Sequence, residues 1–355
     1  MTLIRISVWL ICITALFVSL DCPAATSVPL ASELLDKYTH ALDSTQSFIS
    51  TWESSEVWTQ NVPSLGLRAN KKREFRKGQY RTDNKGRYYE KSYGWENAPG
   101  SRRGDTKQNE RYLLYVIGDD FLYRHNRPLG QTEHSGYIEH RQKDTPGWDT
   151  HDRKTWGYFD GTLTNSFFLG YVDKQARFDR VLRNARRISV RPKPEMLNGS
   201  ACYVIEARTN RGDFKLWLDS EHGYHPARIQ AFVGVGDDIG PPGSPHIITK
   251  KEGITRRYTM DNVRFEKVDD VWVPMEADRK SYIVLRSENG FSDIKLHFKR
   301  NKILLNPDHD ALKSFADPMK NPEFDPELRN GTEVNLNLGD SIKREWFDGE
   351  VATWN

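Results

Sequence analysis

The sequence predicts an α+β protein that is mainly β, in which a large curled antiparallel sheet forms an unclosed barrel with helices packed on its concave side. The clearest signal is the segment 202–233, where apolar and polar residues alternate and two glycine-containing turns interrupt the alternation. Similar alternation recurs along much of the chain, whereas helical spacing is confined to two stretches. A sheet of roughly ten strands must curl, and helices would then cover its concave side.

The first half of the chain is expected to begin with a helix and to continue as strands. After Pro29, apolar residues such as Leu34, Leu35 and Leu42 recur at helical spacing along one stripe. Period-two alternation predicts strands near 48–60, 70–77, 79–83 and 87–93, and a hairpin at 111–125. Segments rich in glycine, proline and polar residues predict long loops at 94–110 and 127–153.

The second half adds a second helix and further strands. The helix is expected within 165–187, where Phe178 and Leu182 share a face. Strands follow in the meander 186–233 and at 254–266, 271–285 and 291–300. From about residue 303 recurrent prolines predict a mostly irregular C-terminal extension, which is compatible with a closing hairpin between Glu333 and Trp354.

Residues 1–25 have the layout of a secretory signal peptide. Arg5 precedes an apolar run of about 15 residues, shorter than the roughly 20 that a membrane-spanning helix needs. Small residues at positions 24 and 25 mark the expected cleavage site, so residues 26–355 would form a single periplasmic domain. Lipid attachment at Cys22 is disfavoured because Asp21 stands where a small residue is normally required.

Composition narrows the classes of partner. The net charge is +3, with 37% hydrophobic and 28% charged residues, so a dedicated nucleic-acid-binding protein is not expected. Removal of the signal would leave Cys202 as the only cysteine, which excludes an intramolecular disulfide. Ten basic and three acidic residues lie between Arg68 and Lys91, either as the solvated face of a sheet or as a contact for anionic head groups or an acidic partner.

The sequence contains no recognisable catalytic motif. The Gly-x-Ser-x-Gly elbow, the His-Glu-x-x-His zinc motif and the phosphate-binding glycine loop are all missing. The densest group of potential metal ligands lies in predicted loops and matches no metal template: His125, His134, His140, Asp149, His151 and Asp152. We therefore expect no catalytic residue, no metal site and no cofactor.

Three segments resemble the LolA-like superfamily, which contains the bacterial outer-membrane lipoprotein-sorting carriers. Residues 34–53, LLDKYTHALDSTQSFISTWE, are similar to the start of these proteins after the signal, and 202–232, CYVIEARTNRGDFKLWLDSEHGYHPARIQAF, are similar to their most recognisable strands. The ending IKREWFDGEVATWN resembles the tails of larger relatives. Long insertions near 94–110 and 127–160 and the C-terminal extension depart from the dedicated carriers. The resemblance implies an unclosed barrel around helices, an apolar cavity for acyl chains and no catalysis.

An acyl-chain carrier needs little directional chemistry, because each buried methylene contributes on the order of 0.8 kcal/mol. Stiff aromatic side chains hold a cavity open better than flexible aliphatic ones. The expected lining residues are Trp52, Trp58, Tyr80, Tyr115 and Trp217. Contact with a head group or a protein partner is expected from Lys71, Lys72 and Arg73.

The sequence favours an exported, non-enzymatic lipid- or lipoprotein-binding protein that holds acyl chains and contacts membranes only peripherally. A second hypothesis is a periplasmic sensor or interaction protein that uses the same fold as a platform for an envelope protein. A third is a secreted hydrolase that uses the histidines and aspartates of the loops. Co-purifying lipid would support the first, a partner lost on charge reversal at Lys71, Lys72 and Arg73 the second, and a stoichiometric metal ion the third.

Overall fold

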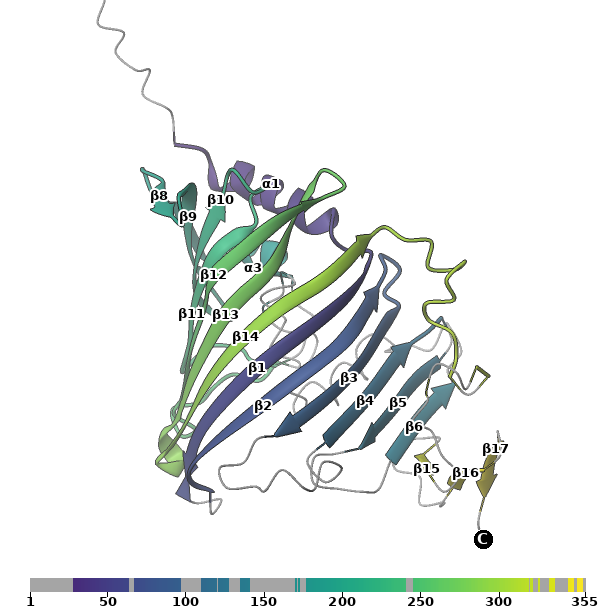
Figure 1. The fold of residues 1–355 in the computed structure, drawn as a ribbon. Helices are drawn as coiled ribbons and strands as arrows, with labels where there is room; N and C mark the ends of the chain where they lie inside the picture. Colours follow the sequence, from purple (N-terminus) through teal and green to yellow (C-terminus); the bar gives the residue numbers. More distant parts are fainter. Residues whose placement is uncertain are drawn as a thin grey trace, which may run out of the picture.

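The computed structural model shows a mostly β protein with a large, unclosed antiparallel sheet and two helices (Figure 1). It describes residues 28–63, 67–96, 110–119, 121–127, 135–140, 170, 172, 177–240, 245–318, 320–321, 325, 332–335, 344–347 and 350–353. The expected signal peptide at 1–25 therefore lies outside the described residues. No helix in the described part of the chain has the length and hydrophobicity to cross a membrane.

Within these residues the sheet contains 17 strands. The strands are β1 (Phe48–Val62), β2 (Leu67–Thr82), β3 (Tyr88–Glu96), β4 (Glu110–Ile117), β5 (Phe121–Arg127), β6 (Ser135–His140), β7 (Arg187–Val190), β8 (Glu195–Leu197), β9 (Ser200–Thr209), β10 (Gly212–Asp219), β11 (Pro226–Val233), β12 (Ile254–Val268), β13 (Val271–Leu285), β14 (Gly290–Leu305), β15 (Thr332–Asn335), β16 (Arg344–Phe347) and β17 (Glu350–Thr353).

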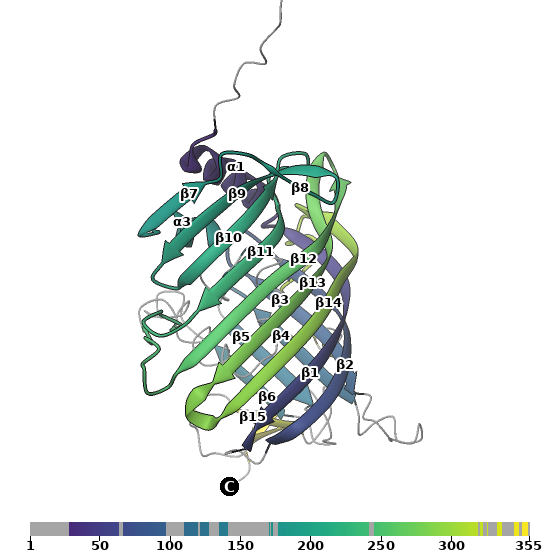
Figure 2. The same ribbon diagram turned by 90° about the vertical axis from the view of Figure 1, so that its left-hand side faces the viewer.

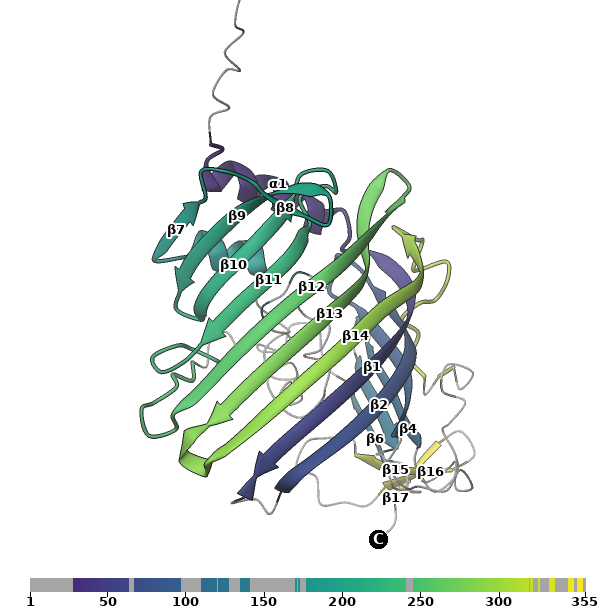
Figure 3. The ribbon, with the colours of Figure 1, turned by 60° about the vertical axis from the view of Figure 1, so that its left-hand side comes forward.

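The pairing of β1 with β14 joins two groups of strands that are far apart in the sequence in the middle of the sheet. β7 and β8 both pair with one edge of β9, β10 pairs with its other edge, pairing continues in order to β14, and β14 pairs with β1. From β1 the order continues to β6 and then to β15, β16 and β17. All these pairs are antiparallel except β6 with β15. The long central strands bend, so that β3 to β6 lie behind β10 to β13 in Figure 2, and Figure 3 shows the outer side of the same bend.

The two helices pack on the inner face of the bent sheet. α1 (Ala31–Asp43) buries the stripe that the sequence predicts, including Leu34, Leu35 and Leu42. α3 (Phe178–Arg183) is short and buries Phe178 and Leu182. The guanidinium of Arg177 lies 2.6 Å from both Asp43 and Asp179, which joins the start of α3 to the end of α1.

The main core lies between these helices and the inner face. It contains helix residues such as Tyr38 and Phe178 together with Phe48, Phe214 and Leu216 from the strands. Because each strand alternates its faces, this contact defines the inner positions of β1 and β10 as the even-numbered ones. A smaller cluster around Cys202 and Trp217 lies on the outer face of β9 and β10.

The C-terminal extension covers part of the outer face on β3 to β5. Phe315 packs into a cluster with Tyr89, Tyr112 and Phe121. Asp325 is 2% exposed and accepts three hydrogen bonds: from the hydroxyl of Tyr112 at 2.8 Å, from that of Tyr123 at 2.6 Å and from Nδ1 of His125 at 2.7 Å. An aromatic contact and a buried carboxylate thus both attach the extension to the sheet.

Several sequence predictions of local structure need correction. The two expected strands at 70–77 and 79–83 are one strand, β2, because Gly78 continues the ladder instead of ending it. The predicted loop at 127–153 contains strand β6, and the described part of the expected second helix at 165–187 contains α3, whereas most of 165–176 lies outside the described residues. The predicted C-terminal hairpin is present as β16 and β17. The predicted loop at 94–110 lies mostly outside the described residues.

Candidate functional site

A row of aromatic side chains crosses the inner face from β14 to β4. The indole of Trp52 stacks on Tyr80, with ring centroids 5.0 Å apart, and on Phe298 at 5.7 Å. Tyr88 continues the row, 6.2 Å from Tyr80 and 6.0 Å from Tyr115. These five residues, which we call the aromatic row, come from the five neighbouring strands β14, β1, β2, β3 and β4.

Gly78 explains how the row is built. It pairs directly with Trp52, so the indole lies over a backbone position that has no side chain. A Cβ atom at Gly78 would lie 2.3 Å from the carbonyl oxygen of Lys91 and 2.9 Å from the Trp52 ring. Glycine inside a strand often marks such a close approach. The stacking of Trp52 on Tyr80 therefore depends on this glycine.

A belt of charged and polar side chains runs beside the aromatic row on the same face. Register places Arg279 of β13, Leu296 of β14, Glu56 of β1 and Glu74 of β2 in one line across the sheet. Glu74 accepts two hydrogen bonds from Arg76, at 2.6 and 3.0 Å. Including Arg256 and Ser281, which occupy inner positions of β12 and β13, we call these residues the polar belt: Glu56, Glu74, Arg76, Arg256, Arg279 and Ser281.

Burial and neighbouring charges shift the pKa values of the polar-belt residues in opposite directions. Burial raises the pKa of the Glu56 carboxyl, although Arg76 and Arg279 partly oppose the shift. Burial also disfavours ionisation of Glu74, but hydrogen bonds and charge from Arg76 outweigh it and lower the pKa. Burial lowers the pKa of Arg279, although electrostatic interactions with Tyr258 and Glu56 partly oppose this shift. The belt thus holds both signs of charge in a poorly solvated place, where a polar ligand group would interact strongly.

Some buried donor atoms on this face have no hydrogen-bond partner among the described residues. They include Nε1 of Trp52, Oγ of Ser281 and Nε of Arg256. Ser281 pairs with Tyr258, whose ring lies 5.9 Å from the guanidinium of Arg279, so these groups adjoin one another. Buried donors nearly always have an acceptor in folded proteins. Their presence beside the aromatic row points to a surface able to bind oxygen atoms.

Four of the five predicted lining residues lie on the same face of the sheet, and three of them, Trp52, Tyr80 and Tyr115, belong to the aromatic row. Trp52, Trp58, Tyr80 and Tyr115 all occupy the inner face. Trp217 lies on the outer face, where its Nε1 donates to Glu195 at 2.7 Å and the Lys215 ammonium lies over its ring. It therefore does not join the other four. The sequence carried a signal for this, since Trp217 alternates with the apolar residues Phe214, Leu216 and Leu218.

The predicted basic triplet is divided between the two faces. Lys72 pairs with Trp58 and occupies an inner position, whereas Lys71 and Arg73 occupy outer ones. All three side chains are exposed. Of the potential metal ligands in the predicted loops, His125 is buried against Asp325 in β5, and His134, Asp149, His151 and Asp152 lie outside the described residues. His140 ends β6.

Sequence reasoning missed the residues of the polar belt. Arg279, Ser281 and Arg256 belong to strands that are far from Trp52 in sequence, and only the pairing of β1 with β14 brings them close. The main core fills the helix-covered end of the inner face with described side chains, and Trp52, Tyr80 and Phe298 of the aromatic row belong to this core. A ligand surface on the inner face would therefore lie beyond these three residues, along half-buried Tyr88 and Tyr115 and the polar belt.

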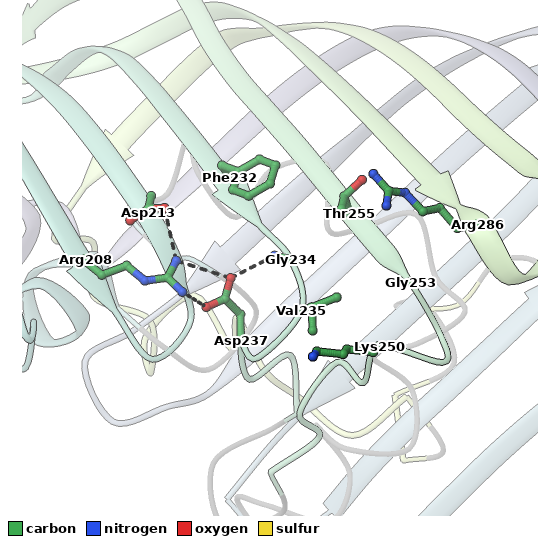
Figure 4. A pocket seen from close by; sticks show the side chains of 10 residues that line it. All are labelled: Arg208, Asp213, Phe232, Gly234, Val235, Asp237, Lys250, Gly253, Thr255 and Arg286. Atoms are coloured by element: carbon green, nitrogen blue, oxygen red, sulfur yellow. Dashed lines mark hydrogen bonds and ion pairs between the residues drawn. The ribbon is translucent and has the colours of Figure 1, made fainter.

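A pocket of about 510 Å³ opens on the outer side of the sheet, where β9 to β12 end (Figure 4). On one wall Arg208 lies 2.7 Å from Asp237 and 3.2 Å from Asp213. Lys250 and Arg286 line the other side (Figure 4). The carboxylates neutralise the nearest guanidinium, so the pocket selects no single class of ligand.

Comparisons with known proteins do not place the chain in a family. No family model matches it, and no curated protein matches it. A solved structure described as "Asymmetric conductivity of engineered proteins" is 8% identical, with a TM-score of 0.18, over 71% of this chain and 99% of its own. A likeness at that level supports no argument about function.

Proposed function

We propose that this protein is an exported, non-enzymatic carrier that binds an amphipathic, lipid-like ligand on the inner face of its open sheet. The observation that carries the proposal is the combination of a stacked aromatic row with buried polar donors on one face. Rings provide apolar contact for hydrocarbon, and the polar belt provides contact for the oxygen atoms of a head group. The expected signal peptide and the resemblance to LolA-like carriers agree with this proposal.

The two parts of this face suit the two parts of such a ligand. Tyr88 and Tyr115, the half-buried members of the row, offer ring surface that packs against methylene groups without directional bonds. Each buried methylene would contribute about 0.8 kcal/mol, so a short contact length already gives measurable affinity. Arg256 and Ser281 lie where a phosphate or carboxylate could accept their hydrogens, and guanidinium groups bind both anions well.

Fluorescence quenching by a brominated fatty acid tests this proposal directly. The matched variants are Trp58→Phe, on the inner face beside the polar belt, and Trp217→Phe, on the outer face. Bound ligand should quench the emission of the wild-type protein, and Trp58→Phe should lose a larger share of that quenching than Trp217→Phe. Equal loss in the two variants would place the ligand elsewhere.

Native mass spectrometry of protein purified from an envelope fraction provides the second test. We expect a population carrying one lipid-sized adduct, which organic extraction removes. Ser281→Ala, which deletes a single buried hydroxyl, should reduce the adduct without changing the circular dichroism spectrum. Protein that is repeatedly free of adduct, and that takes up no fluorescent fatty acid, would refute the carrier function.

A further inference from the structure

Cations and aromatic rings alternate on the outer face of β2 and β3. Outward positions of β2 carry Arg73, Phe75 and Lys77, and Trp95 and Tyr93 of β3 stand opposite Phe75 and Lys77. The Phe75 and Trp95 rings stack with centroids 6.5 Å apart. Arg73 lies 5.7 Å from the Phe75 ring, and the Lys77 ammonium lies 5.8 Å from the Trp95 ring. We call these five residues the cation–aromatic face.

Positive charge is concentrated on this side of the sheet. Outward positions 71–81 of β2 and 89–95 of β3 carry no acidic residue. Across β14, β1, β2 and β3 the outward positions carry eight basic residues and two acidic ones, Glu53 and Asp293, and Glu53 lies 3.8 Å from Lys299. The excess of six exceeds the net charge of +3 of the entire chain.

Part of this surface is open and part is covered. Lys71, Arg73 and Lys77 are exposed, and Phe75 and Trp95 are half-buried. At the other end of β2, Arg81 donates to the carbonyl oxygen of Ser314 at 3.2 Å, beneath the C-terminal extension. The accessible part of this surface is therefore the stretch of β2 from Lys71 to Lys77.

We propose that the cation–aromatic face is a docking surface for a membrane rich in anionic phospholipids. Lysine and arginine near such a membrane are attracted by its negative surface potential. Tryptophan and tyrosine favour the level of the head groups, because one part of each ring system is apolar and another is polar. An outer sheet face that interleaves both kinds of side chain fits that boundary. The net charge of the whole chain is too small for a dedicated nucleic-acid-binding protein.

This docking surface is independent of the inner-face ligand site. β2 supplies residues to both, but Lys77 and Tyr80 stand on opposite faces of that strand. A protein that failed to bind lipid in solution could therefore still bind vesicles. Equally, a protein that failed to bind vesicles could still bind lipid in solution. The tests of the two proposals separate them accordingly.

Vesicle co-sedimentation of the mature chain tests the docking surface. The probes are vesicles of phosphatidylcholine alone and of phosphatidylcholine with about 30% phosphatidylglycerol, at about 0.1 M salt. The test variant is Lys71→Gln/Arg73→Gln/Lys77→Gln. The matched control, Lys193→Gln/Lys251→Gln/Lys313→Gln, removes three exposed lysines elsewhere and changes the net charge equally.

The wild-type protein should bind the anionic vesicles and not the neutral ones. Each basic residue near the surface is worth about a fivefold change in partitioning, so the test variant should bind roughly 100-fold more weakly and the control nearly as well as wild type. Trp95→Phe should abolish most of the quenching by brominated lipid in the same vesicles. Equal binding by the two triple variants, binding to neutral vesicles, or tighter binding to a single-stranded oligonucleotide would overturn the proposal. Wild-type binding that is unchanged at about 0.5 M salt would also overturn it.

Discussion

The buried carboxylate of Asp325 should dominate the attachment of the C-terminal extension. Asp325→Asn keeps the size of the side chain but leaves one good acceptor for three convergent donors, on Tyr112, Tyr123 and His125. A hydrogen bond to a charged group contributes about 1.5–3 kcal/mol, and a buried donor left alone costs a similar amount. We therefore expect the free energy of unfolding to fall by about 3 kcal/mol, and by more in Asp325→Ala.

The pH dependence of this loss has a definite sign. Burial disfavours the ionised form of Asp325, but hydrogen bonds from His125, Tyr123 and Tyr112 outweigh burial and hold its pKa below the ordinary 3.8. The folded protein thus binds this proton less tightly than the unfolded chain does. The contribution of Asp325 is complete above about pH 4 and is lost as the pH falls through the folded pKa. The difference between wild type and Asp325→Asn should shrink over the same range.

Urea unfolding followed by tryptophan fluorescence measures both the loss of stability in Asp325→Asn and its dependence on pH. Asp310→Asn is the matched control, because Asp310 lies in the same extension and pairs with Arg87 but is exposed. It should change the midpoint far less than Asp325→Asn. Limited proteolysis should also cut the extension faster in Asp325→Asn. Equal midpoints for the two variants would refute the reasoning.

Three further variants or groups have predictable behaviour. Gly78→Ala should lower the free energy of unfolding by about 1–3 kcal/mol and alter the near-ultraviolet circular dichroism, since a methyl group would collide with the Lys91 carbonyl and the Trp52 ring. Burial lowers the pKa of His225 from 6.5 to about 4, so the unfolded chain binds this proton more tightly and stability should decrease by about 3 kcal/mol from pH 7 to pH 4; His225→Gln should lack this part of the slope in urea titrations. Burial raises the pKa of the Cys202 thiol to about 12, so its reaction with a disulfide reagent at about pH 8 should be slow until urea opens the sheet.

Alternation in the sequence predicted most strands because it reflects a local property, the two-sidedness of a strand. In β1, for example, Phe48, Trp52 and Trp58 are spaced by even numbers of residues, and they share the inner face. Alternation failed at Gly78, where glycine has a packing role opposite Trp52 that no local pattern distinguishes from a turn. It also failed at β6, whose sequence has too few β-branched residues to suggest a strand.

The site was less predictable than the fold, because its residues converge through distant pairings. Local sequence does not show that β1 pairs with β14, so nothing near Trp52 indicated that Arg279 and Ser281 would share its face. Trp217 illustrates a different difficulty. Its aromatic character suggested a lining role, whereas the apolar alternation of β10 assigned the inner face to Leu216 and its neighbours.

Strand β2 shows why one sheet can serve two binding roles without conflict. Its inward residues, Arg76 and Tyr80, belong to the polar belt and the aromatic row, and its outward residues, Arg73 and Lys77, belong to the cation–aromatic face. A strand separates these sets by its pleat, so a charge removed from one face leaves the packing of the other unchanged. A carrier with this construction could lie against a membrane by its outer face while its inner face held the ligand. Two results together would identify that arrangement. The variant with Lys71, Arg73 and Lys77 replaced should lose vesicle binding but keep normal quenching by the ligand, and Trp58→Phe should bind vesicles normally but show reduced quenching by the ligand.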